Sequence, residues 1–94
     1  MTPEGKVQSE IVKYARKQGF MALRFEVMQV VGFPDLMLLG HRTAAFIEVK
    51  RKGKVASKMQ EWRLEQIRAC GLMATHCDNI EEAQEFIHEV IKSK

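Results

Sequence analysis

A short apolar stretch at residues 46–50, Phe-Ile-Glu-Val-Lys, constrains the fold of this chain more than any other. It predicts a β-strand, in which successive side chains point to opposite faces. Glu48 and Lys50 then share one face, while Ile47 and Val49 share the other. Burying an ion is costly unless the ion is paired or binds a metal. Taken alone, the stretch fits an edge strand whose polar face lies in water, so the neighbouring segments must show whether it is more than that.

Length and composition predict one globular domain spanning residues 1–94. The chain has 94 residues, of which 46% are apolar and 29% charged, enough for a single hydrophobic core. No apolar run reaches the ~18 residues of a membrane-spanning helix, and the first residues lack a hydrophobic signal region. Cys70 and Cys77 are too few for a disulfide framework and fit reduced thiols. We therefore expect an intracellular, cytoplasmic protein without a membrane partner. Its net charge of +3 permits a polyanionic partner without requiring one.

Hydrophobic periodicity and capping signals predict seven elements in the order αβββαβα. A mixed four-stranded sheet with helices on both faces follows from a hairpin, a crossover helix and a further strand. The first helix starts with Thr2-Pro3-Glu4, and a later one has a Ser57–Gln60 capping box. The apolar side of that later helix is marked by Met59, Trp62, Ile67 and Cys70. The expected elements are a helix ending before Gly19, strands at 21–28, 36–39 and 44–50, a helix at 57–70, a strand at 72–77 and a helix after Asn79.

Four charged residues occupy positions that packing alone would not give them. Glu10 falls on the apolar stripe of the first helix and should face the core or its edge. Asp35 follows Pro34 at the head of an apolar strand, and an antiparallel hairpin would bring it near Glu48 and Lys50. One interpretation is that all four charges are solvated surface. The other is that the converging carboxylates bind a cation.

Converging carboxylates are suited to a hard divalent cation such as Mg²⁺ or Mn²⁺, which takes oxygen ligands from one or two carboxylates, waters and substrate phosphates. A lysine beside such a site is compatible with an anionic substrate. This set of groups fits phosphodiester hydrolysis, in which the metal polarises a phosphoryl oxygen and the ammonium positions water or offsets developing charge.

The same residues resemble a known pattern. Pro34-Asp35 followed by Glu48-Val49-Lys50 matches the PD-(D/E)xK signature, whose restriction-endonuclease-like core has the order αβββαβ. More narrowly, the chain resembles the standalone virus-type replication–repair nuclease (VRR-NUC) domain, a resemblance that spans nearly all of it. The shared marks are Glu10, Gly-x-Pro-Asp at 32–35, Phe-Ile-Glu-Val-Lys at 46–50, Gln60 with Trp62, and Gly71.

The resemblance implies roles for individual residues. Asp35 and Glu48 would bind the metal, with the backbone carbonyl of Val49 completing the shell. Lys50 would orient water or stabilise the transition state. Two further residues would assist: Glu10 would support the metal directly or through water, and Gln60 would orient Lys50 or the water.

The resemblance also implies the substrate. Standalone members of the family resemble structure-specific endonucleases that cut four-way (Holliday) junctions as homodimers, and two symmetric cuts fit a two-fold dimer. We therefore expect a DNA-repair protein, of phage or bacterial origin. The first strand and residues 28–31 are candidates for the dimer interface. A flap, single-strand or restriction-type nuclease is an alternative, as is a non-catalytic nucleic-acid-binding module. From their placement, we expect the DNA backbone to contact Arg24, Arg51, Lys52, Lys54 and Lys58.

Overall fold

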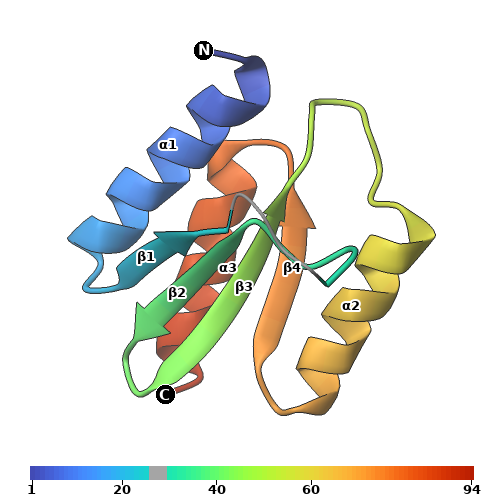
Figure 1. The fold of residues 1–94 in the computed structure, drawn as a ribbon. Helices are drawn as coiled ribbons and strands as arrows, with labels where there is room; N and C mark the ends of the chain where they lie inside the picture. The colour runs from blue at the N-terminus through green and yellow to red at the C-terminus, as the bar shows by residue number, and fades with distance from the viewer. Residues whose placement is uncertain (26–29) are drawn as a thin grey trace.

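The computed structural model describes residues 1–25 and 30–94, and these form the predicted α/β fold with the order αβββαβα. The first strand is confirmed only as far as Arg24, and residues 26–28, which the sequence assigned to it, lie outside the described residues. The elements are α1 (Pro3–Lys17), β1 (Met21–Arg24), β2 (Leu36–Gly40), β3 (Thr43–Val49), α2 (Lys58–Ala69), β4 (Met73–Cys77) and α3 (Ile80–Lys92) (Figure 1).

The four strands form one mixed sheet in the order β1-β2-β3-β4. The first three strands are antiparallel to their neighbours, whereas β4 runs parallel to β3 after the α2 crossover. Leu36, the first residue of β2, pairs with Ile47 near the end of β3. The start of β2 and the end of β3 therefore meet at one end of the sheet, between its two inner strands, as the predicted hairpin requires.

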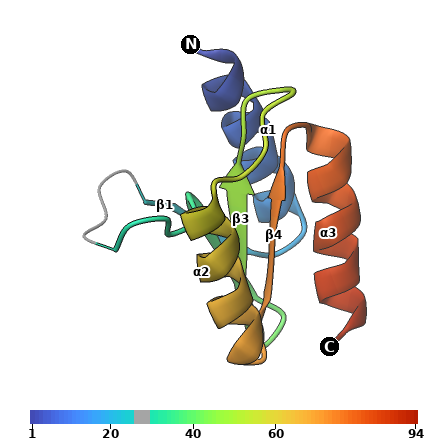
Figure 2. The same ribbon diagram turned by 90° about the vertical axis from the view of Figure 1, so that its right-hand side faces the viewer.

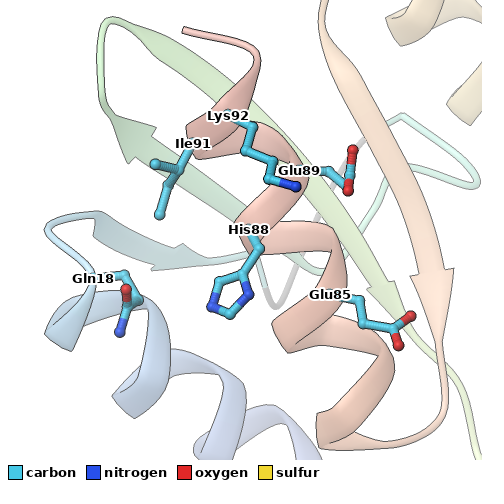
Figure 3. A pocket seen from close by; sticks show the side chains of 6 residues that line it. All are labelled: Gln18, Glu85, His88, Glu89, Ile91 and Lys92. Carbon is cyan, nitrogen blue, oxygen red and sulfur yellow. The ribbon is translucent and has the colours of Figure 1, made fainter.

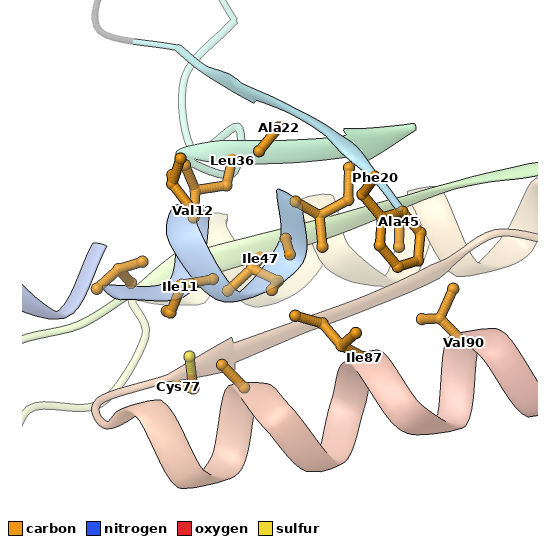
Figure 4. Packing of buried hydrophobic residues seen from close by; sticks show 14 residues of the cluster. Ile11, Val12, Phe20, Ala22, Leu36, Ala45, Ile47, Cys77, Ile87 and Val90 are labelled. Atoms are coloured by element: carbon orange, nitrogen blue, oxygen red, sulfur yellow. The ribbon is translucent and has the colours of Figure 1, made fainter. Parts of the chain in front are cut away.

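Helices cover both faces of the sheet, with α1 and α3 on one face and α2 on the other (Figure 2). The face under α1 and α3 holds the larger hydrophobic cluster, in which Ile11 and Ile87 lie with Ile47 and Val49 of β3 (Figure 4). The alternate residue Phe46 lies instead in a smaller cluster formed mainly with α2. Since side chains alternate along a strand, Glu48 and Lys50 belong to the α2 side.

The predicted apolar side of α2 is wrong at three of its four positions. Ile67 is buried, together with Leu64, but Met59 and Trp62 are 43% and 50% exposed and Cys70 is also exposed. The stripe that faces the sheet runs through Leu64 and Ile67, whose spacing of three residues places them on one side of a helix.

Capping signals fix the helix starts as predicted. The Thr2 hydroxyl accepts from the N–H of Gly5, and the Ser57 hydroxyl accepts from the N–H of Gln60. Asn79 caps α3 in the same way. Within residues 1–25 and 30–94, no helix has the length and hydrophobicity needed to cross a membrane.

Candidate active site

Asp35 and Glu48 meet at the end of the sheet where β2 begins and β3 ends. Asp35 directly precedes Leu36, and Glu48 directly follows Ile47, the partner of Leu36 across the two strands. The Oδ2 atom of Asp35 accepts a hydrogen bond of 3.0 Å from the backbone N–H of Val49. The backbone carbonyl of Asp35 accepts another, of 2.7 Å, from Phe25. Main-chain contacts therefore hold the carboxylate of Asp35 beside the end of β3.

Glu48 is a buried carboxyl group, only 5% exposed. Its Oε2 atom accepts a 2.9 Å hydrogen bond from Nε2 of Gln60 and lies 3.9 Å from Nζ of Lys50. Its Oε1 atom is buried with no hydrogen-bond partner among the described residues. An unsatisfied buried oxygen is costly in a folded protein, which makes this atom the clearest indication that the site takes a ligand.

Gln60 connects the helix cap to the charged residues of β3. Its Oε1 atom accepts from the backbone N–H of Ser57 at 2.9 Å and from Nζ of Lys50 at 2.7 Å. Its Nε2 atom donates to Glu48. The orientation of the amide follows from these partners, because two donors face the oxygen and an acceptor faces the nitrogen. The capping box thus does more than start α2: it fixes the Lys50 ammonium next to Glu48.

The two carboxyl groups have raised pKa values. Burial, and after it the nearby charge of Asp35, raises the pKa of Glu48 to about 8, against the opposing ammonium of Lys50. Burial also raises the pKa of Asp35, which the hydrogen bond from Val49 partly offsets. The pair is therefore reluctant to carry two negative charges without a compensating cation.

These residues fit a hard divalent cation. Within residues 1–25 and 30–94, no group of three or more His, Cys, Asp or Glu side chains gathers to hold a metal. Mg²⁺ commonly needs only one or two carboxylates and completes its shell with waters and substrate phosphates. Asp35 and the unpartnered Oε1 of Glu48 supply two such oxygens. The donor chemistry therefore fits a divalent cation that completes its shell with waters or phosphate oxygens.

Glu10 does not join this group. It is exposed and lines a hollow of ≈ 270 Å³ together with Tyr14 of α1 and with Ile80 and Gln84 of α3. That hollow belongs to the α1 and α3 face, whereas Glu48 and Lys50 belong to the α2 face. Of the two expected positions, the core or its edge, Glu10 therefore takes the edge, where its side chain reaches solvent between α1 and α3.

Glu4 is the acidic residue of α1 that lies near the site. Its Oε1 atom is 3.5 Å from Nε of Arg51, and it lines a hollow of ≈ 320 Å³ with Lys50, Arg51 and Lys54. Its charge also makes a small contribution to raising the pKa of Asp35. The sequence indicated Glu4 only as a first-turn acid. Glu4 lies in the first turn of α1, next to the loop that follows β3. This position could not be predicted from the sequence, because it depends on how α1 packs on the sheet.

The five predicted DNA-contacting residues are exposed, but in two places. Arg51 and Lys54 lie in the loop after β3 and line the hollow beside Lys50. Lys52 belongs to the same loop, which Asp78 holds through the N–H of Gly53 at 3.4 Å, and Lys58 is the first residue of α2. Arg24 instead ends β1 and donates to the Ser9 hydroxyl of α1 at 3.3 Å.

A larger hollow, of ≈ 620 Å³, lies elsewhere, between the end of α1 and the second half of α3 (Figure 3). Gln18 borders it from α1, and His88 borders it from α3, where its Nε2 atom is 2.6 Å from the Tyr14 hydroxyl. Glu85, Glu89 and Lys92 follow one another along α3 (Figure 3). Size alone therefore does not identify a chemical site, since the candidate residue Lys50 borders the smaller hollow that it shares with Arg51 and Lys54.

Comparison with known proteins agrees with this fold. No protein-family model matches the sequence, and a search of curated proteins finds no match. One solved structure, described as a VRR_NUC domain, superposes with a TM-score of 0.82 at 22% identity and covers 94% of this chain and 97% of its own. A second, described as a VRR_NUC domain protein, has a TM-score of 0.80 at 21% identity and covers 97% of this chain and 89% of its own.

The chain has the fold of VRR_NUC domains over nearly all of its length, which confirms the fold that the sequence motifs predicted.

Proposed function

We propose that this protein is a divalent-metal-dependent endonuclease that hydrolyses phosphodiester bonds in DNA. The observation that carries the proposal is the pairing of a buried Glu48, whose Oε1 has no partner among the described residues, with Asp35 and with a lysine fixed by Gln60. The two structural neighbours, described as VRR_NUC domains, support the same activity.

Asp35 and Glu48 would hold the cation, with the Val49 carbonyl as a further ligand. The bound Mg²⁺ or Mn²⁺ would supply Lewis-acid stabilisation of charge on the phosphoryl group and lower the pKa of a water molecule. Asp35 contributes a carboxylate that the N–H of Val49 keeps in place. Glu48 contributes an oxygen whose burial excludes competing water.

Lys50 would act on the attacking water and on developing charge. Its ammonium has three N–H donors, of which one is directed to Oε1 of Gln60 at 2.7 Å. The Lys50 side chain is 18% exposed and borders the hollow shared with Arg51 and Lys54. The remaining donors can therefore reach a water or a phosphate oxygen entering that hollow. Gln60 acts as a positioning residue through its contacts with Lys50 and Glu48.

The basic loop would bind the DNA backbone beside the reacting phosphate. Arg51, Lys52 and Lys54 are exposed, and Lys58 extends the set onto α2. Cations of this kind supply sequence-independent affinity that weakens as salt rises. Arg24 lies on the other side of the sheet, beside Ser9 of α1, so it would contact DNA separately from the basic loop.

The preferred substrate proposed for this nuclease is a four-way junction, cut by a homodimer in DNA repair. The support is the resemblance to standalone junction-cutting nucleases and the match between two symmetric cuts and a two-fold axis. Of the residues suggested for the interface, Met21, Val30 and Val31 are 59%, 39% and 68% exposed, whereas residues 28 and 29 lie outside the described residues.

A cleavage assay with a panel of DNA substrates tests the activity. Four-way junction, flap, duplex and single-stranded DNA are incubated with Mg²⁺, with Mn²⁺ and with EDTA. Cleavage should require a metal and should be lost in Asp35→Asn and Lys50→Met, while Glu65→Gln serves as a control on the outer side of α2. Binding without cleavage under every metal condition would instead identify a non-catalytic binding module.

The same panel and a mass measurement test the substrate and the assembly. Paired cuts on opposite junction strands, together with a dimer mass in light scattering, agree with the junction proposal. Preferred cutting of flaps, single strands or specific duplex sequences by a monomer would exclude junction resolution and retain only the nuclease.

A further inference from the structure

Three large apolar side chains lie exposed beside the candidate active site, on α2 and on the segment before β2. Val31, Met59 and Trp62 are 68%, 43% and 50% exposed, and we call this group the α2 shelf. Isolated apolar residues on a surface are common, but adjacent ones that include a tryptophan mark interaction sites more often. Trp62 is on the side of α2 away from Leu64, so packing against the sheet does not account for a tryptophan at this position.

The shelf is held rigidly. Arg63 donates from Nε to the backbone carbonyl of Val31 at 2.9 Å and from Nη1 to Gln66 at 2.8 Å. Its guanidinium carbon also lies 4.7 Å from the centre of the Trp62 ring. Gly32, at φ +81°, packs so closely on Met59 that an added Cβ would lie 2.7 Å from its side chain. The aromatic surface is therefore preorganised, so little conformational entropy is lost when a partner binds.

The two segments that carry the shelf also carry the site. Val31 is four residues before Asp35, and Met59 and Trp62 flank Gln60, which contacts Lys50 and Glu48. Gln60 lies on the side of α2 that faces the sheet and Trp62 on the opposite side, so they are separated by about the helix diameter of ~10–12 Å. A strand that crosses the start of α2 can contact both Lys50 and the indole.

The charges around the shelf favour an anionic partner with flat apolar groups. Lys58 lies one turn before Trp62, on the same side of the helix, and Arg63 covers one face of the ring. Glu65, on the next turn, is paired with Arg68, and an oxygen of Glu61 lies 3.0 Å from Nε2 of His76. A cationic aromatic surface of this kind binds single-stranded nucleic acid by stacking bases and contacting phosphates.

We propose that Trp62 stacks on an unpaired nucleobase of the DNA strand that occupies the active site, and so selects DNA in which a base is exposed near the scissile phosphate. This inference rests on the proposed nuclease function and adds the structural feature that the enzyme recognises. Bases inside a regular duplex are already stacked on their neighbours, whereas those at gaps, bulges and branch points can turn out onto the indole.

A second copy of the chain fits the shelf less well. A two-fold contact centred on Trp62 would bring Lys58 and Arg63 of one subunit close to the same cations of the other, because an isologous interface repeats the same surface. A DNA strand instead brings phosphates to these cations.

Binding in EDTA tests the proposal without cleavage. Fluorescence anisotropy compares labelled duplexes that contain a single-base bulge with the same duplexes carrying an abasic bulge, which keeps the phosphate but lacks the base. Trp62→Ala should weaken binding to the bulged duplex by about 10- to 100-fold. It should leave the abasic duplex almost unchanged, and Trp62→Phe should retain most of the affinity. Glu81→Gln, an exposed control on α3, should change neither.

Tryptophan fluorescence gives a second readout, because Trp62 is the only tryptophan in the sequence. Bulged DNA should quench its emission more strongly than the abasic duplex at equal saturation. Equal quenching by the two duplexes, together with binding of the bulged duplex by Trp62→Ala as tight as by the wild type, would overturn the stacking proposal and leave the nuclease intact. A protein that binds neither duplex would overturn both. Conversion of a dimer to a monomer by Trp62→Ala would assign the shelf to a second copy instead.

Discussion

The side-chain amide of Gln60 donates a 2.9 Å hydrogen bond to Glu48 and accepts a 2.7 Å one from Lys50. One residue of α2 therefore sets the spacing between a buried carboxyl group and an ammonium on β3. The contact explains why a capping residue belongs to the site: the helix start that it stabilises is also the support for Lys50.

Replacing Gln60 by alanine should lower cleavage by about 10- to 100-fold, the usual effect of removing a residue that orients metal ligands. The substitution also removes half of the capping box, so Ser57→Ala is the matched control: it weakens the cap by ~1 kcal/mol but leaves Gln60 beside Lys50. Thermal melts and cleavage rates are measured for both variants. A rate for Ser57→Ala as low as that of Gln60→Ala would reduce the role of Gln60 to folding.

The metal-free protein should become less stable as the pH rises toward 8. Burial raises the pKa of Glu48 from its ordinary 4.5 to about 8, so between these values the folded state holds a proton that the unfolded state has released. The free energy of unfolding then falls with rising pH across this range and levels off above it. Denaturant melts in EDTA measure the slope. Glu48→Gln cannot ionise and should flatten it; an unchanged slope would assign the effect to other groups.

Binding of Mg²⁺ or Mn²⁺ should release protons and tighten as the pH rises from about 6 to about 8, because the ligands must be deprotonated. Calorimetric titration in buffers of different ionisation enthalpy measures the proton count. Asp35→Asn and Glu48→Gln should each abolish the metal-induced rise in melting temperature. If both variants bound the metal as well as the wild type does, the cation would lie elsewhere.

Glu4 and Glu10 provide a comparison within one helix. Glu4→Gln should reduce cleavage, because Glu4 pairs with Arg51 and borders the hollow beside Lys50. Glu10→Gln should cleave at close to the wild-type rate, because Glu10 lies between α1 and α3. Single-turnover rates at saturating metal compare the two variants. If Glu10→Gln slowed cleavage and Glu4→Gln did not, Glu10 would be the residue that supports the metal, as the motif implied.

Ile47 should be among the most costly core positions to truncate. It is 0% exposed and lies on β3 between Phe46 and Glu48, on the α1 and α3 side of the sheet. Ile47→Ala should lower the free energy of unfolding by ~2–5 kcal/mol. Val55→Ala, at a residue that is 83% exposed, should change it by less than ~0.5 kcal/mol. Urea denaturation of the two variants gives both values.

Much of this protein follows from local sequence signals. The caps at Thr2, Ser57 and Asn79 set the helix starts because a side chain must satisfy free N–H groups there. The apolar runs at residues 36–39 and 44–50 specify two strands, and the short connection between them specifies their antiparallel pairing. Pairing then places Asp35 beside Glu48, so the centre of the candidate site could be predicted.

Other features depend on which face a helix presents, and only the tertiary structure decided them. The apolar stripe of α1 allowed Glu10 near the core, yet the packing of α1 against α3 leaves it exposed and brings Glu4 to Arg51 instead. Trp62 was expected on the apolar side of α2, but the buried residues that pack against the sheet are Leu64 and Ile67, and the indole is exposed to solvent. The sequence by itself determined the order of the elements and the paired carboxylates, because strand alternation and capping are local. Which helix residues lie next to the site depends on how each helix is rotated about its own axis. That rotation is set by contacts between segments far apart in the chain, so only the tertiary structure shows it.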